Sequence, residues 1–411
     1  MQNIKYKMQT QIENNDLINK TFSRETVENN KNVSIVDSND KFGLELFCYN
    51  SCNNDSDENT KQCRGMVFNG NNLVMRSFSY ANEYNETQTT EIKKELGSDL
   101  NDWRVFPSYE GTLLRMFFFQ DKWFLSTHRK LNAFLSKWSS RDSFGVIFEK
   151  AIQNEFDKNT DFANFLSKEG KTLFQRFENT LDKTKQYLFL VKNNIENRIV
   201  CDVSKDYPLF LHVGTVVNGT ITTLDYLFPS LKLYPHLVPT YDVNNLLEIV
   251  GYMNPYQEQG FICFRNSDGK QIKILNSKYQ ELCKIRNNEP SLKFRYLQVR
   301  MDEKMTNSLY ELYPNYAKYF DEYENTIRQI SNYIYRSYVD RFIKKQLVKL
   351  PKQEFLVMKD CHNWHVSDRE HNKISLPKVF QFMNMQAATN INQMVKRFLR
   401  EKNQTENSQT E

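Results

Sequence analysis

The sequence predicts an α+β protein in which a β-rich domain of residues 1–285 precedes an all-helical domain of residues 286–400. The chain has 411 residues, more than the roughly 250–300 at which a single hydrophobic core stops growing, so two domains are expected. In the first domain, short apolar runs alternate with turn residues, which is typical of strands. In the second domain, apolar residues recur every three or four positions, as they do on one face of a helix.

The strand predictions start from a hairpin. Apolar runs at 63–68 and 73–76 flank Asn69-Gly70, and Asn-Gly between two apolar runs is the usual signal for a tight antiparallel turn. The other predicted strands are 42–47, 112–119, 122–126, 187–191, 198–201, 209–217, 260–264 and 271–275.

Helices are predicted in both domains. One lies inside the β-rich domain at 142–166, where Asp142 or Ser143 can cap its start. In the helical domain, a stripe of Tyr and Ile over 319–342 predicts a helix face packed in a core, and an aromatic platform for nucleic acid is the alternative. The polar residues 401–411 are predicted to form a disordered tail.

Composition excludes several classes of protein. The chain has a mean hydropathy of −0.68 and contains no apolar run near the ~18 residues that a membrane span needs. Its first residues lack the apolar segment of a signal peptide. With 12 Gly and 10 Pro against 30 Phe and 22 Tyr, it is neither collagen-like nor rich in linkers or glycine loops. A net charge of +5 permits nucleic-acid binding without requiring it.

Cysteine and histidine usage predicts neither disulfides nor a metal site. The seven cysteines are odd in number and scattered, unlike a disulfide framework, which favours a reducing, cytosol-like compartment. Cys361, His362, His365 and His371 gather four potential zinc ligands, but their spacing matches no specific zinc pattern, so a structural role is preferred. A second group is expected to act as buried small hydrophobes, namely Cys48, Cys52 and Cys63.

Six groups of residues follow one another within residues 42–280. They are, in chain order, Arg64-Gly65-Met66-Val67-Phe68 with Arg76-Ser77-Phe78; Ser108-Tyr109-Glu110-Gly111-Thr112-Leu113 with Trp123-Phe124-Leu125-Ser126; Asn197-Arg198-Ile199-Val200; Leu211-His212-Val213-Gly214; Gln259-Gly260-Phe261-Ile262; and Lys273-Ile274-Leu275 with Tyr279. In this order they resemble the motifs of phage-type RNA ligase 1 enzymes, which are covalent nucleotidyltransferases.

The resemblance implies a nucleotidyltransferase-like (ATP-grasp-like ligase) fold, with antiparallel sheets flanking a cleft and a helical C-terminal domain. In that family a lysine amine attacks the α-phosphate of ATP and forms a lysine–AMP intermediate. Acidic residues bind the ribose and a divalent metal, and further lysines offset the charge of the phosphates. The RNA 5′-phosphate is then adenylylated, and a 3′-hydroxyl displaces AMP.

This sequence departs from the family at the charged positions. Ser108 stands where the family has its nucleophilic lysine, and a serine hydroxyl cannot replace that amine without a dedicated base. No acid is found at 190–192, shortly before the third motif. Three other positions lack the family's charge, namely Tyr80, Gln259 (although Glu258 adjoins it) and Leu275, which strand alternation places on the face of Lys273. All these changes remove charge from the phosphate and metal site, so we expect self-adenylylation to be lost.

Binding is the property that we expect to survive. Cations beside aromatic residues suit single-stranded RNA, through phosphate pairing and base stacking, and solvated surface cations are the alternative interpretation of any one of them. The candidate residues for nucleotide or RNA binding are Arg64, Gly65, Arg76, Glu110, Gly111, Arg115, Arg198 and Lys273.

The predicted function is that of an RNA-ligase-like pseudoenzyme that binds RNA or a protein partner, with no cofactor and no membrane. The first alternative is an active ATP-dependent RNA ligase in RNA repair, which would use ATP and Mg²⁺ and would need another lysine, such as Lys122, to reach the pocket. The second is a structural or assembly subunit that reuses the fold. The Asn- and Lys-rich, Gly-poor composition resembles that of large DNA viruses, so a cytoplasmic location is expected, in the host if the protein is viral.

Overall fold

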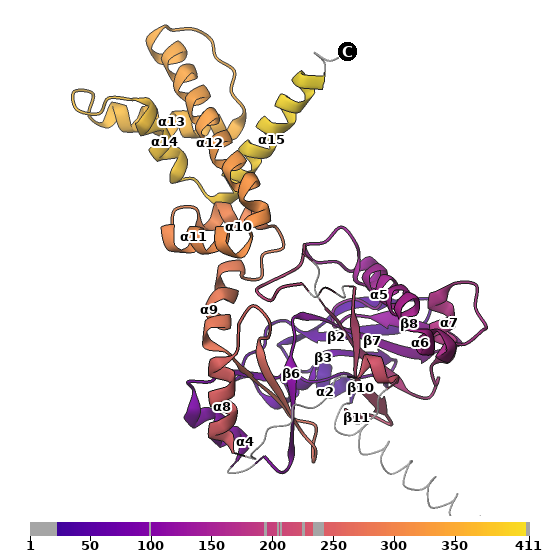
Figure 1. Cartoon of the computed structure of the whole chain (residues 1–411). Coiled ribbons are helices and arrows are strands. Elements are labelled where there is room, and N and C mark those ends of the chain that lie inside the picture. The colour runs from indigo at the N-terminus through magenta and orange to yellow at the C-terminus, as the bar shows by residue number, and fades with distance from the viewer. Residues whose placement is uncertain are drawn as a thin grey trace, which may run out of the picture. The chain divides into compact units, whose positions relative to one another are not determined.

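The structure is a computed structural model that describes residues 23–97, 100–192, 195–203, 205, 208–223, 227–232 and 242–407. The chain divides into two compact units, residues 1–281 and 282–411. The division falls in helix α9 (Ser277–Arg286), the helix that also contains the boundary expected at residue 285. Figure 1 shows the sheets in the first unit and the helices of the second. The predicted α+β class, antiparallel sheets followed by helices, is confirmed.

The described strands of the N-terminal unit form three sheets. The first has the strand order β1 (Val33–Asn39), β2 (Leu44–Tyr49), β3 (Arg64–Asn69), β4 (Asn72–Met75). The second has the order β11 (Thr220–Thr222), β10 (Phe210–Val217), β9 (Gln186–Lys192), β7 (Gly111–Phe119), β8 (Lys122–Ser126). The third has the order β5 (Asn82–Asn85), β13 (Gln271–Leu275), β12 (Gly260–Arg265), β6 (Trp103–Ser108). Among the described strands, β13 and β5 form the only parallel pair.

Helices surround these sheets. Those of the N-terminal unit are α2 (Arg24–Glu28), α3 (Glu58–Gln62), α4 (Thr89–Leu96), α5 (Phe144–Lys158), α6 (Thr160–Phe165), α7 (Leu173–Thr180) and α8 (Val243–Tyr252), with the short 3-10 turns η1 (Ala133–Leu135) and η2 (Pro229–Leu231).

The predicted hairpin of this unit forms, and the predicted strands 112–119 and 122–126 form a second one. The Asn69-Gly70 signal joins β3 to β4, and Gly70 adopts a φ of 55°, which the turn requires. Strands β7 and β8 are joined by Gln120 and Asp121, whose φ angles of 45° and 59° are those of a tight turn with a left-handed backbone.

Two other predictions need correction. The helix expected at 142–166 is two helices, α5 and α6, because Asn159 leaves the helical conformation and its side chain accepts a hydrogen bond of 3.1 Å from the Phe162 amide to begin α6. The strand expected at 198–201 does not form. Its backbone amides bind a side-chain carboxylate instead of a neighbouring strand.

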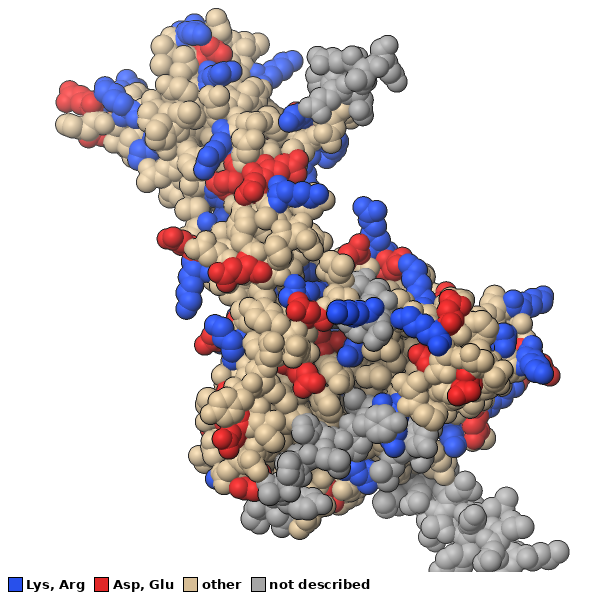
Figure 2. Space-filling view, viewed as in Figure 1, with Lys and Arg blue, Asp and Glu red and all other residues tan. Residues whose placement is uncertain are grey.

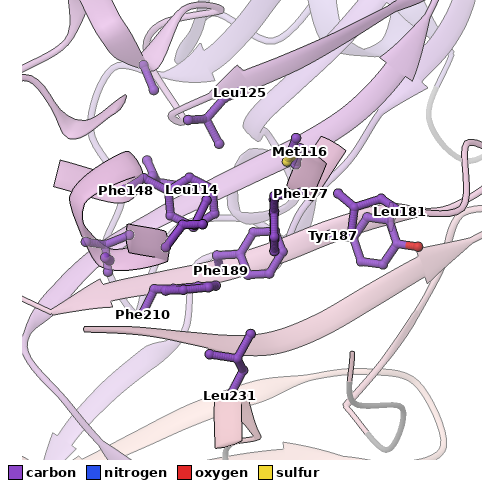
Figure 3. Close-up of a cluster of buried hydrophobic side chains, with 14 of the residues drawn as sticks. Leu114, Met116, Leu125, Phe148, Phe177, Leu181, Tyr187, Phe189, Phe210 and Leu231 are labelled. Carbon is purple, nitrogen blue, oxygen red and sulfur yellow. The ribbon is translucent and has the colours of Figure 1, made fainter. Parts of the chain in front are cut away.

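An aromatic core lies between the second sheet and α5–α7. Figure 3 shows Phe148 of α5 and Phe177 of α7 meeting Phe189 of β9 and Phe210 of β10. The rings of Phe148 and Phe210 meet edge to face with centroids 5.0 Å apart, and those of Phe148 and Phe189 are 5.2 Å apart. Edge-to-face contacts add to the free energy of burial. Part of the chain's high phenylalanine content is thereby explained as core.

The third sheet is buried on both faces. Its side chains alternate between a face that packs on helices and a face that lines a cavity. Phe261 and Cys263 of β12 pack with α4 and α8, which Figure 1 shows together on one side of that sheet. Ile262 and Phe264 alternate with them and point to the opposite face, toward the second sheet. One face of the sheet therefore packs against helices, and the other face lines a cavity.

Helices make up the described part of the C-terminal unit. They are α10 (Leu292–Val299), α11 (Glu303–Leu312), α12 (Ala317–Tyr338), α13 (Lys352–Ser367), α14 (Leu376–Asn384) and α15 (Ala388–Asn407), with the 3-10 turn η3 (Pro314–Tyr316) and the π-helical turn η4 (Val339–Ile343). The predicted stripe lies on α12, where Phe320, Ile327 and Ile334 are completely buried. The interpretation of this stripe as a core face is confirmed.

The end of the chain is more helical than predicted. Helix α15 extends to Asn407, into the segment expected to be a disordered tail from residue 401 onward, while residues 408–411 lie outside the described residues. Glu401, Lys402 and Gln404 are good helix formers, so a polar composition does not end the helix here. In the described part of the chain, no helix is long and apolar enough to cross a membrane.

Candidate functional site

A cleft of about 990 Å³, measured with its solvent-open mouth, lies between the second and third sheets of the N-terminal unit. One wall contains Ser108 of β6, Phe264 of β12 and Lys273 of β13. The opposite wall contains Gly111 of β7 and Leu190 of β9. Its lining is concave and largely apolar with a few polar groups, as the linings of ligand pockets commonly are.

The lining combines apolar walls with a few cations. Its apolar surface comes from Phe78, Ala81, Phe106, Leu113, Ile262 and Phe264. Arg64, Lys232 and Lys273 supply positive charge, and no Asp or Glu is found among the described residues of the lining. Flat aromatic groups next to cations suit a ligand that has a ring and a phosphate.

A directed chain of hydrogen bonds starts at Ser108, on the cleft wall. The Ser108 hydroxyl donates to Gln259 Oε1 at 3.0 Å, and Gln259 Nε2 donates to the Tyr279 hydroxyl at 2.8 Å. Tyr279 donates in turn to Glu110 Oε1 at 3.0 Å. The resemblance had aligned Ser108, Gln259 and Glu110 with charged positions of a ligase site, and the structure brings these three side chains into one network.

Glu110 ends this chain and anchors a loop. Its carboxylate accepts hydrogen bonds from the backbone amides of Ile199 at 3.0 Å, Val200 at 2.6 Å and Cys201 at 2.9 Å. Glu110 is itself buried. With four donors on two oxygens, its acceptor capacity is largely used by the protein. Glu110 therefore holds the Asn197–Cys201 segment in place and is not presented to the cleft.

Lys273 is paired across the third sheet. Its Nζ lies 2.7 Å from Glu83 Oε1, because β13 and β5 run parallel with these two residues in register. This ammonium, above all other influences, holds the pKa of the Glu83 carboxyl below its usual range. Lys273 thus lines the cleft with a cation that is partly neutralised.

Arg64 lies in a cationic corner of the same cleft. It donates to the Ser79 carbonyl at 3.5 Å, a long contact that leaves most of its guanidinium donors unused by that bond. Burial, followed by the charges of Arg64, Arg115 and Arg129, lowers the pKa of His128 to about 3, so this imidazole is neutral. Arg64 therefore lines the cleft with guanidinium donors that can meet an anion.

Arg115 and Gly65 form a structural pair. Arg115 is fully buried and donates from its two terminal nitrogens to the carbonyls of Gly65 and Thr127. Gly65 has a φ of +80°, and a Cβ there would clash with Arg115 Nη1 and lie 2.8 Å from the His128 Cα. The close approach of the buried guanidinium explains this glycine, and neither residue lines the cleft.

The other candidates from the sequence also bind their own chain. Arg76 donates to the Gly219 carbonyl at 3.2 Å and to Gln62 at 3.1 Å. Arg198 donates to the carbonyls of Val200 and Cys201. Of the eight binding candidates, Arg64, Gly111 and Lys273 line the cleft, and the remaining five lie outside its lining.

The positions where the sequence departs from the ligase pattern fall in different places. Tyr80 is half-buried outside the cleft lining, and burial raises its pKa to about 12. Leu275 shares a strand face with Lys273, but it is buried and is not among the residues that line the cleft. Lys122, the substitute nucleophile considered for an active ligase, lies over the rings of Phe42 and Phe124 at 5.5 and 5.4 Å and does not line the cleft.

The potential zinc ligands of α13 and of the turn after it have separate contacts. His362 stacks on Phe342 with ring centroids 3.8 Å apart, while the Nδ1 of His365 lies 2.6 Å from the Asn372 carbonyl. His371 pairs with Asp368, and Cys361 is buried. Within the ranges that the structure describes, no three His, Cys, Asp or Glu side chains are grouped so as to hold a metal.

Two cations near the cleft were missed from the sequence. Lys232 follows the short turn η2 and forms an isolated bridge with His212, so no motif marks it. Lys192 lies opposite Gly111 in the β9–β7 register, and its Nζ is 3.7 Å from the ring centroid of Tyr109, which lines the cleft. The pairing of Lys192 with Gly111 is what places Lys192 near the cleft, so only the strand register could have identified it as a candidate.

Proteins of iridescent viruses are similar to this chain in sequence. The "Immediate-early protein ICP-46 homolog" of Invertebrate iridescent virus 6 is 28% identical over 339 residues, which cover 80% of this chain and 72% of the viral protein. Its namesake in Invertebrate iridescent virus 3 is 26% identical over 378 residues, 85% of this chain and 77% of that protein. "Immediate-early protein ICP-46" of Frog virus 3 matches 34% of this chain at 27% identity. No family model matches the sequence.

Two solved structures superimpose on this chain with low scores. One is a protein assigned as an ATP-dependent DNA ligase in Aquifex aeolicus, with a TM-score of 0.36, 12% identity and coverage of 81% of this chain and 85% of that one. The other is an archaeal ATP-dependent RNA ligase, with a TM-score of 0.32, 13% identity and coverage of 72% and 68%. Scores below 0.5 do not establish a common fold.

Proposed function

We propose that this chain is a nucleotidyltransferase-like pseudoenzyme whose cleft binds a phosphorylated nucleotide, free or at the 5′ end of an RNA, without forming a covalent adduct. The observation that carries this proposal is the hydrogen bond from the Ser108 hydroxyl to Gln259 Oε1. An amide oxygen is not a base at neutral pH, so it cannot activate a nucleophile. The hydroxyl that occupies the nucleophile position is held in a structural bond.

The rest of the network supports the same conclusion. A general base for Ser108 would have to reach its proton, and the nearest carboxylate of the network, Glu110, is separated from it by Gln259 and Tyr279. Glu110 already accepts three backbone amides. The chain of donors therefore stabilises the cleft wall rather than moving protons away from Ser108.

Binding is supported by the lining itself. Arg64, on β3, can form paired hydrogen bonds to a phosphate. Lys273, on β13 of the third sheet, adds a second cation to the lining. Phe78 and Phe264 lie edge to face at 6.2 Å and both line the cleft, so a base has aromatic surface to contact. Sequence similarity to viral proteins names no activity, so the proposal depends on the site and on the motif resemblance.

Binding measurements test this proposal. We expect titration calorimetry to detect ATP, AMP and a 5′-phosphorylated oligoribonucleotide, and to show weaker binding of the same oligomer with a 5′-hydroxyl. Arg64→Ala should weaken phosphate-dependent binding by about ten-fold to a hundred-fold, since hydrogen bonds to charged groups contribute about 1.5–3 kcal/mol. Lys122→Ala is the matched control, because Lys122 lies outside the cleft lining, and it should leave affinity unchanged. Equal affinity for the 5′-phosphate and 5′-hydroxyl forms, unaffected by Arg64→Ala, would overturn the proposal.

A further inference from the structure

The net positive charge of this protein comes from its helical unit. Residues 282–411 contain 22 Lys and Arg against 15 Asp and Glu, a net charge of +7, so residues 1–281 contain 33 against 35, a net charge of −2. Figure 2 shows Lys and Arg side chains spread over the visible face of this unit. The cleft proposed above belongs to the unit that is slightly acidic, so its function does not explain this charge.

A pair of stacked rings marks one place in the helical unit. Helix α12 ends in the π-helical turn η4, from which a loop returns to α13 (Figure 1). In that turn Phe342 stacks on His362 of α13, with centroids 3.8 Å apart and planes 12° from parallel. Both rings are half-buried. π-Helical turns are rare and often occur at functional sites.

Cations surround this ring pair. The Arg341 guanidinium lies 5.7 Å from the Phe342 centroid and 5.6 Å from that of Phe355. Burial lowers the pKa of His362, and the charges of His365, Arg369, Lys345 and Arg341 lower it further, so these groups lie around its ring. Lys345 and Arg369 are exposed.

Three of the five carboxylates on η4, α13 and the turn after α13 form ion pairs. Asp340 pairs with Lys344 at 2.9 Å, Glu354 pairs with Arg397, and Asp368 pairs with His371 at 3.0 Å. Asp360 and Glu370 are exposed on α13 and the turn that follows it. Among the ion pairs of the described residues, none involves Arg341, Lys345 or Arg369. These three cations remain available for an anionic partner.

We propose that the basic corner, formed by Arg341, Phe342, Lys345, His362 and Arg369, is a second binding site that takes single-stranded nucleic acid. The cations contact successive phosphates, and a base stacks at the Phe342–His362 pair. A single strand fits better than a duplex, because its bases can leave their own stack to meet a protein ring. This site is independent of the cleft, since it needs no terminal phosphate.

The test uses the full-length protein and a labelled RNA of about 12 nucleotides with a 5′-hydroxyl, followed by fluorescence anisotropy at several salt concentrations. We expect Lys345→Glu with Arg369→Glu to weaken binding at least ten-fold. Loss of two phosphate contacts should also reduce the slope of log affinity against log salt by about 1.4, at about 0.7 per contact. His362→Ala should weaken binding and leave the slope unchanged.

A matched control separates this site from general charge. Lys304→Glu with Lys396→Glu changes the net charge equally at exposed positions on α11 and α15, and it should change affinity by less than about three-fold. Arg64→Ala should leave this 5′-hydroxyl RNA bound, so failure of the cleft proposal would not affect the result. Equal losses in the two double variants would overturn the proposal, and so would equal affinity for blunt duplex RNA. Ile343 and Leu347 are exposed apolar residues beside the basic corner. Tighter binding to phosphatidylserine vesicles than to RNA would therefore also overturn it. Melting curves by circular dichroism establish that every variant is folded.

Discussion

The Tyr279 hydroxyl donates a hydrogen bond of 3.0 Å to Glu110 Oε1, joining helix α9 to the connection between β6 and β7 across 169 positions of sequence. Both residues are buried, and Gln259 extends the contact to Ser108 on the cleft wall. The position that resembles a catalytic nucleophile is therefore part of a network that stabilises the fold.

Glu110→Gln tests how much this network contributes to the stability of the fold. The amide keeps one acceptor oxygen but places an NH₂ where the carboxylate accepts a backbone amide, so at least one buried donor is left without an acceptor. We expect the N-terminal unit to lose about 2–3 kcal/mol of unfolding free energy, measured by urea denaturation. Glu258→Gln, at a half-buried position nearby, should stay within about 0.5 kcal/mol of wild type. An unchanged denaturation midpoint for Glu110→Gln would contradict the assigned role.

Gly65→Ala tests the close approach of Arg115. The new Cβ would meet both the guanidinium and the His128 backbone, and the residue would keep a left-handed φ. We expect a loss of about 3 kcal/mol or more, from strain and clash together. Gly70→Ala is the control, because Gly70 has a φ of +55° and no atom lies within 4 Å of the position that its Cβ would take. It should show only the backbone cost of about 1–2 kcal/mol. Similar losses for the two variants would argue against the clash.

The Lys273–Glu83 ion pair predicts a change in stability with pH. Because Lys273 lowers the pKa of Glu83 in the folded protein, the pair stabilises the fold fully above the ordinary Glu pKa of about 4.3. That contribution is lost as the pH falls through the lowered folded value. Its size should be below about 1 kcal/mol, since the two side chains are 28% and 41% exposed and are screened by solvent. Unfolding curves between pH 6 and pH 3 should show this loss in the wild type, and none of it in Glu83→Gln.

Glu83→Gln should also strengthen binding in the cleft. Removing the carboxylate leaves the Lys273 ammonium free to meet a phosphate, so we expect affinity for ATP to rise about three- to five-fold. Glu281→Gln is the matched control, because Glu281 forms an exposed pair with Lys278 on α9, and it should leave affinity unchanged. Calorimetry on both variants checks this. Weaker binding by Glu83→Gln would indicate that the pair positions Lys273 instead of competing for it.

Local signals in the sequence predicted much of the fold. Asn69-Gly70 identified a hairpin because its turn geometry is set by the residues themselves, and the α12 stripe identified a core face because its spacing follows the helical repeat. The strand expected at 198–201 failed because its amides bind Glu110, some 90 residues earlier, which no local pattern reveals. Asn159 divided the helix expected at 142–166 by capping the helix that follows it.

The site was harder to predict than the fold. Arg115 resembles a phosphate ligand in sequence, but β7 is covered on both sides along its centre, so the guanidinium is buried and binds carbonyls. The partner of Lys273 comes from a parallel strand 190 positions away, and the resemblance could not supply it. The position of Lys192 beside Tyr109 is set by the β9–β7 register. The charged motif positions predicted the part of the fold that contains the site. The role of each charged side chain depends on partners that are distant in the sequence.

Incubation of the protein with α-labelled ATP and Mg²⁺ or Mn²⁺, followed by denaturing electrophoresis, tests the central claim most directly. An active ATP-dependent ligase provides the positive control, and its lysine–AMP adduct is labile to acid. The Ser108–Gln259 bond predicts that this protein remains unlabelled with either metal while still binding ATP in solution. A stoichiometric, acid-labile adduct on any lysine would contradict the account and establish the chain as a working nucleotidyltransferase.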